Sequence, residues 1–95
     1  CEQVEESLEE LEGMLCAPET VETAYDAKEL ARYISSFVRS LPREKGDLFI
    51  RRYWYFDSVE QLAHDFGMSQ GRVKTMLFRM RGQLKAALRK EGYML

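Results

Sequence analysis

The 95-residue chain lacks most of the patterns that mark exported, membrane-spanning or disulfide-linked proteins. Its two cysteines, Cys1 and Cys16, form neither a disulfide framework nor a zinc-binding pattern. No apolar run approaches the length that crosses a bilayer, and no signal-peptide pattern opens the chain. We therefore expect a cytoplasmic protein with no membrane partner. Because the chain does not begin with Met, we also expect it to be a fragment of a longer protein.

Sequence patterns of catalysis are also absent. The chain has no phosphate-binding loop, no nucleotide-binding glycine pattern, no nucleophile elbow and no cluster of metal ligands. His64, the only histidine, has no ligand partner at helical spacing, which favours a solvated residue. The adjacent acids Glu5-Glu6 and Glu9-Glu10 are typical of a solvated helix face. We therefore expect no enzyme, no cofactor and no metal site.

Charge is distributed unevenly along a chain whose net charge is only −2. Residues 1–30 hold ten acids and one base, whereas residues 31–95 hold thirteen bases and six acids. An acidic segment joined to a basic one is typical of a nucleic-acid-binding domain with a separately used tail. We expect an acidic helical arm or linker over residues 1–19 and one small domain over residues 20–95.

Apolar spacing predicts an all-α fold, a compact helical bundle without strands. A linker is expected near residues 13–19, where Gly13 and Pro18 interrupt the helical pattern. The expected helices cover residues 2–15, a segment from after Pro18 to before Leu41, residues 43–55, a short segment after Ser58, and a long segment from Gln70 to about Glu91, where Gly92 ends it.

Two of these helices carry more specific expectations. An a/d-like stripe on the first predicts a local packing face rather than a coiled coil; its members are Val4, Leu8, Leu11 and Leu15. The helix over residues 43–55 is expected to turn these side chains inward: Leu48, Phe49, Tyr53 and Phe56. Arg51 and Arg52 are expected outward. Trp54 and Tyr55 cannot both be buried on the same face, so one is expected to be exposed to a partner.

Residues 58–79 carry the most informative pattern, a short helix, a glycine turn and a second helix. Ser58 and Gln61 have capping-box spacing, Gly67 stands where a tight turn needs positive φ, and Ser69 can cap the second helix. The buried side of that helix is expected at Val73, Leu77 and Met80. This order predicts a helix-turn-helix, which places a long C-terminal recognition helix in the DNA major groove.

The side of the second helix opposite its apolar stripe is expected to meet DNA. The first turns of a recognition helix usually meet base edges, Lys74 suits a guanine edge or a phosphate, and arginines suit phosphate oxygens. A solvated helix with ordinary surface cations is the alternative, which the two caps and the glycine turn disfavour. The expected DNA-binding residues are Gln70, Gly71, Arg72, Lys74, Thr75, Phe78, Arg79 and Arg81.

These segments together resemble region 4 of bacterial RNA polymerase sigma factors of the extracytoplasmic-function type. The resemblance spans roughly residues 20–91 and depends on four motifs in order, at residues 41–42, 49–54, 58–63 and 67–79. It implies a compact helical domain that binds the upstream, or −35, promoter element and docks on the β-subunit flap of core RNA polymerase. We expect the chain to be a monomer. Arg51, Arg52 and Trp54 match the part that the family uses for polymerase docking. An anti-sigma factor is a further implied partner.

The chain departs from the family at two DNA-facing positions, with Arg72 where Thr is usual and Met76 where Arg is frequent. The promoter sequence read is therefore expected to be unusual. Two other functions stay open: the output domain of a response regulator, and a protein-interaction module that binds an anti-sigma factor or polymerase without reading DNA. Salt-dependent DNA binding separates the protein-interaction module from the two DNA-binding functions, the sigma-like domain and the response-regulator output domain.

Overall fold

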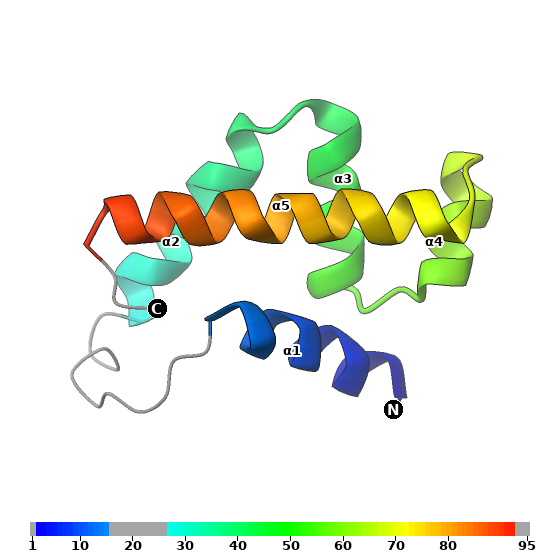
Figure 1. The fold of residues 1–95 in the computed structure, drawn as a ribbon, viewed down its shortest axis with the longest axis horizontal. Coiled ribbons are helices and arrows are strands. Elements are labelled where there is room, and N and C mark those ends of the chain that lie inside the picture. The colour runs from blue at the N-terminus through cyan, green and yellow to red at the C-terminus, as the bar shows by residue number, and fades with distance from the viewer. Residues whose placement is uncertain (1, 16–26, 93–95) are drawn as a thin grey trace.

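The computed structural model describes residues 2–15 and 27–92, which contain five helices (Figure 1). They are α1 (Glu2–Leu15), α2 (Ala27–Ser40), α3 (Arg43–Tyr53), α4 (Val59–Phe66) and α5 (Gln70–Lys90). This part of the chain contains no strand, so the expected all-α class is confirmed. None of these helices is long and apolar enough to cross a membrane. Cys1, Cys16 and the start of the segment after Pro18 lie outside the described residues.

Helix α5 contributes five buried side chains to the core and runs along most of the length of the molecule in Figure 1. Its buried side chains recur every three or four residues and are each at most 2% exposed: Val73, Leu77, Met80, Leu84 and Leu88. The first three are those expected from the sequence. They pack with buried residues of the other helices, which are Val38, Leu48, Phe49, Tyr53, Leu62 and Ala63. Burial of each large apolar side chain stabilises the fold by about 1.5–3 kcal/mol.

Helix α3 ends earlier than residue 55, where the apolar pattern placed its end. Trp54 follows the last helical residue, and Phe56 adopts a left-handed φ of 58°, which a β-carbon disfavours. The backbone N–H of Asp57 donates to the carbonyl of Arg51 at 2.9 Å, which closes the turn. As a result Phe56 is only half-buried, whereas its expected companions in the core are buried. Trp54 and Tyr55 both project outward, 49% and 71% exposed, although exposure of only one was required.

Helix α1, which is drawn in blue in Figure 1, packs beside α3 and α5. It continues through Gly13 to Leu15, so the linker expected near residues 13–19 begins later than Gly13. The expected apolar stripe is only partly covered, because Leu11 packs against the core while Leu8 is 47% exposed. The side chain of Leu15 lies outside the described part. Polar side chains of α1 add to its contact with the rest of the molecule.

Candidate nucleic-acid interface

The connection between α4 and α5 is built by local hydrogen bonds. The hydroxyl of Ser58 accepts from the N–H of Gln61 at 3.0 Å, and the hydroxyl of Ser69 accepts from the N–H of Arg72 at 3.1 Å. Gly67 has φ of 65°, which only glycine adopts without strain. The capping box is only half formed, because the Gln61 side chain donates to Asp65 at 2.9 Å instead of returning to Ser58. The two serine caps and the glycine turn are thus confirmed, whereas the return bond from Gln61 to Ser58 is not formed.

The sequence-predicted DNA-facing residues lie on one side of the N-terminal half of α5, with a single exception. Seven of the eight are exposed: Gln70, Gly71, Arg72, Lys74, Thr75, Phe78 and Arg79. Phe78 is a large apolar side chain that nonetheless is 69% exposed. Opposite this side, Val73 and Leu77 are buried to 1% exposure or less. The core contacts of α5 thus turn one particular surface of the helix toward solvent.

Within residues 70–81, the exposed surface of α5 has two edges, each of which carries two cations. Successive residues of an α-helix turn by about 100°, so residues seven apart lie on the same side, roughly 10 Å apart. Arg72 and Arg79 therefore lie along one edge and Lys74 and Arg81 along the other. We call the first edge the α3 flank and the second the α1 flank, after the helices beside them.

The α3 flank is an open basic hollow. Its lining combines residues of α5 with one residue of α3: Lys45, Gly71, Arg72, Thr75, Met76 and Arg79. Among the residues that the structure describes, no carboxylate pairs with the three cations of this hollow. Sequence reasoning missed Lys45, because only the packing of α3 against α5 brings it to this flank. An unneutralised group of three cations suits an anion such as a phosphate.

The α1 flank is partly closed, because Arg81 is engaged within the molecule. The Arg81 side chain is only 17% exposed, and it donates to the Glu10 carboxylate at 3.3 Å and to the Tyr53 hydroxyl at 2.6 Å. Arg81 therefore differs from the other seven expected DNA-binding residues. Lys74, on the same flank, is exposed.

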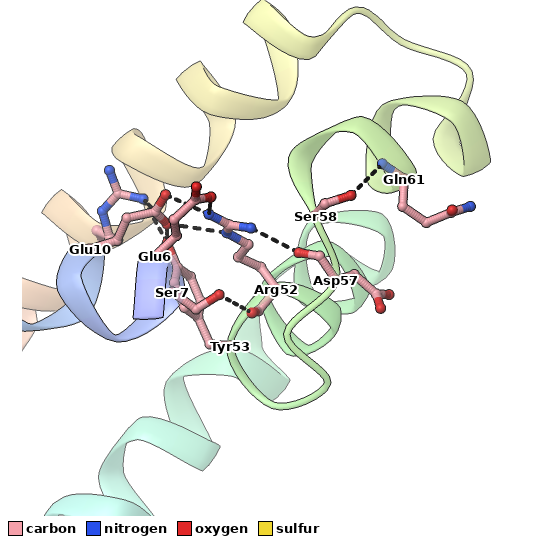
Figure 2. A network of polar contacts seen from close by, with 9 residues as sticks. Glu6, Ser7, Glu10, Arg52, Tyr53, Asp57, Ser58 and Gln61 are labelled. Carbon is pink, nitrogen blue, oxygen red and sulfur yellow. Dashed lines mark hydrogen bonds and ion pairs between the residues drawn. The ribbon is translucent and has the colours of Figure 1, made fainter. Parts of the chain in front are cut away.

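Arg52 lies at the centre of a polar network that joins α1, α3 and the loop before α4 (Figure 2). Its guanidinium donates to both Glu10 oxygens, at 2.9 and 3.3 Å, and to the carbonyl of Asp57 at 2.9 Å. Ser7, fully buried, donates to the Arg52 carbonyl at 2.9 Å. The Arg52 side chain is 1% exposed, so the expectation that it points outward is wrong. The acidic segment covers it, which local patterning within α3 could not indicate.

Glu10 remains ionised within this network. Burial alone would raise the pKa of Glu10, but hydrogen bonds from Arg52 and Tyr53 and the charges of Arg52 and Arg81 hold that pKa below its ordinary value. Burial and the hydrogen bond to Glu10 raise the pKa of Tyr53, so its hydroxyl stays protonated and donates to the carboxylate at 2.7 Å. The network therefore carries its full charge at neutral pH.

A second ionic group holds α4 against the end of α3. Arg51 pairs with Asp57 at 2.7 Å and with Asp65 at 2.5 Å, and its guanidinium lies 5.5 Å from the centre of the Phe66 ring. Hydrogen bonds from Arg51 and His64 lower the pKa of Asp65 to about 2. His64 is exposed, as expected from its position in the sequence. Arg51 thus contributes to the placement of α4, and through α4 to that of α5.

The residues matched to polymerase docking lie in different environments. Arg52 is buried and Arg51 is paired, whereas Trp54 is exposed and borders a partly apolar hollow, which is lined by Ser35, Val38, Arg39 and Ile50. No group of histidine, cysteine and acidic side chains suited to a metal ion occurs in residues 2–15 and 27–92. No protein-family model, curated protein or solved structure matches this chain.

Proposed function

We propose that the chain is a sequence-specific DNA-binding domain for transcription initiation, similar to region 4 of an extracytoplasmic-function sigma factor. Helices α4 and α5 act as a helix-turn-helix, and the N-terminal half of α5 enters the major groove at the upstream promoter element. Four exposed cations around the first three turns of α5 carry this proposal: Lys45, Arg72, Lys74 and Arg79. Such a cluster, beside a helix whose opposite side is buried, suits a phosphate-lined groove.

The two flanks and the surface between them divide the expected contacts. A helix in the major groove has one sugar-phosphate backbone on each side, so Arg72 and Arg79 suit one strand and Lys74 suits the other. Between the flanks, Thr75 and Phe78 face outward toward the base edges. An exposed aromatic ring and a threonine methyl group suit the methyl group of thymine, which only the major groove displays.

Core RNA polymerase is the second partner in this proposal. Trp54 and Tyr55 are both exposed, and Trp54 borders a hollow that Val38 and Ile50 line together with Ser35 and Arg39. Large exposed aromatic side chains beside an apolar hollow are typical of protein contacts. We assign polymerase docking to Trp54 and this hollow, and we leave Arg52 out because it is buried.

Salt-dependent DNA binding tests the proposal. The chain is titrated onto a duplex selected by it from a randomised pool and onto an unrelated duplex, at several salt concentrations. We expect affinity for both duplexes to fall steeply with salt. Replacing Lys74 and Arg79 with Ala should weaken binding to both duplexes, because a lost phosphate contact lowers the affinity for every sequence, and should lower the salt slope by about 2.

The matched control removes two exposed cations from α2, as Lys28→Ala with Arg39→Ala. This control variant has the same net charge as the variant that lacks Lys74 and Arg79. It should bind the selected duplex almost as the parent chain does. Equal losses in both double variants would reduce the role of α5 to nonspecific charge. Retained polymerase binding without any salt-dependent DNA binding would favour the protein-interaction module instead.

A further inference from the structure

Glu10 is the side chain of α1 with the most polar contacts to the rest of the molecule, beside the hydrogen bond of Ser7 to the Arg52 carbonyl and the approach of Glu6 to Arg52 at 3.7 Å. Glu10 accepts hydrogen bonds from two side chains of α3, Arg52 and Tyr53, and from Arg81 of α5. Figure 2 shows Glu10 facing Arg52 from α1, with Asp57 on the far side of the guanidinium. Apolar contacts add to these polar ones, because Leu11 packs against the core and Val4 is half-buried, whereas Leu8 is 47% exposed. Loss of the Glu10 charge should therefore weaken the docking of the helix and raise the fraction of molecules in which it is undocked.

Docked α1 places negative charge on the α1 flank. Glu10 occupies Arg81, which lies seven residues beyond Lys74 and on the same side of α5. Glu5 and Glu9 are exposed on the same short helix and pair with no cation of the described residues. A carboxylate and a phosphate use the same donors of an arginine. A DNA strand on this flank would thus compete with Glu10 for Arg81 and would be repelled by the remaining acids.

We propose that α1 is an autoinhibitory latch that closes the α1 flank through Glu10. With the latch closed, only the α3 flank can hold a DNA backbone, and binding is weak. DNA that engages both flanks displaces α1, and its phosphates replace the Glu10 carboxylate at Arg81. This regulation rests on the proposed DNA-binding function of α5.

The size of the inhibition follows from the fraction of molecules with the latch open. If α1 is docked in about nine molecules of ten, the apparent affinity is about a tenth of that of the open form. Removal of the Glu10 charge raises the fraction of molecules in which the latch is open. The change affects every duplex equally, because the latch competes for the backbone and not for bases.

The test compares two single-charge variants of α1 within the full 95-residue chain. Glu10→Gln removes the charge from the latch, and Glu9→Gln removes the same charge from an exposed neighbour. Duplex affinity is measured by fluorescence anisotropy at low salt. We expect Glu10→Gln to raise affinity about threefold to tenfold and Glu9→Gln to change it by less than about twofold. Equal effects of the two variants, or no gain with Glu10→Gln, would overturn the latch.

Hydrogen exchange of the unmodified chain gives a second result that does not depend on the folding of a variant. Backbone amides of α1 should exchange faster when the chain is saturated with duplex DNA, while those of α5 should not. Unchanged protection of α1 in the complex would also overturn the latch. If neither the parent chain nor Glu10→Gln binds DNA at any salt concentration, the proposed function fails and the latch fails with it. If the parent chain and Glu10→Gln bind DNA with equal affinities, the latch is overturned but the proposed DNA-binding function stands.

Discussion

The two flanks of α5 carry the same number of cations from that helix but differ in what covers them. On the α3 flank, Arg72 and Arg79 stand open beside Lys45, whereas on the α1 flank Arg81 is held by Glu10. The amino-acid types are alike, so composition does not distinguish them. What differs is the neighbouring helix, which supplies another cation on one side and a carboxylate on the other. A basic residue stays open to solvent or forms a structural ion pair according to the helix packed beside it.

The largest expected effect on this comparison comes from Arg52, which holds α1 in place. We expect Arg52→Ala to lower the free energy of unfolding by about 1–3 kcal/mol, because the carbonyl of Asp57 and the Glu10 carboxylate lose their main donor. The corresponding change on the open flank, Arg72→Ala, should stay within about 0.5 kcal/mol. Chemical denaturation followed by circular dichroism measures both. Similar losses in the two variants would show that the flanks do not differ as described.

A smaller effect is expected from acid, which removes the Glu10 charge but leaves its atoms in place. Because the pKa of Glu10 is lower in the folded chain, the interaction contributes its full stability above the ordinary value of 4.5. That contribution is lost as the pH falls through the lowered value. The difference in Tm between the parent chain and Glu10→Gln should therefore be constant near neutral pH and shrink on acidification. A difference that does not depend on pH would contradict an ionised Glu10.

The smallest expected effect concerns Lys45, a single exposed cation of the α3 flank. Lys45→Ala should weaken DNA binding by about 0.5–1 kcal/mol for every sequence and lower the salt slope by about 1. Arg43→Ala is the matched control, because Arg43 is exposed on the same helix and lies 4.0 Å from Asp47. Its effect should be smaller than that of Lys45→Ala. A sequence-dependent loss with Lys45→Ala would instead place this lysine at a base edge.

The sequence predicted the connection between α4 and α5 better than any other part of the molecule. Ser58, Gly67 and Ser69 act within three or four residues of their own positions, through caps and a left-handed turn. The apolar spacing of α5 likewise identified Val73, Leu77 and Met80 as buried. Region 4 similarity, promoter binding, polymerase docking and the monomeric state remain predictions for the experiments above.

Prediction was less successful where charged side chains meet across long separations. Arg52 and Glu10 are 42 residues apart, and Arg81 and Glu10 are 71 apart. Seen within α3 alone, Arg52 looks like a surface cation, because nothing nearby in the sequence indicates that an acidic helix covers it. Lys45 was missed for the converse reason, since nothing in its own helix reveals the hollow that it lines with α5.

The sequence by itself thus determined the helices, their caps and the side of α5 that enters the core, because short-range hydrogen bonds and apolar periodicity are local properties. Only the tertiary structure decided which cations of α5 stay open to solvent and which are paired. That choice depends on the packing of α1 and α3 against α5, where a carboxylate carried to one flank neutralises Arg81 and a lysine carried to the other joins Arg72 and Arg79. Charge is a property of each residue, but its availability depends on whatever the fold places within a few ångströms.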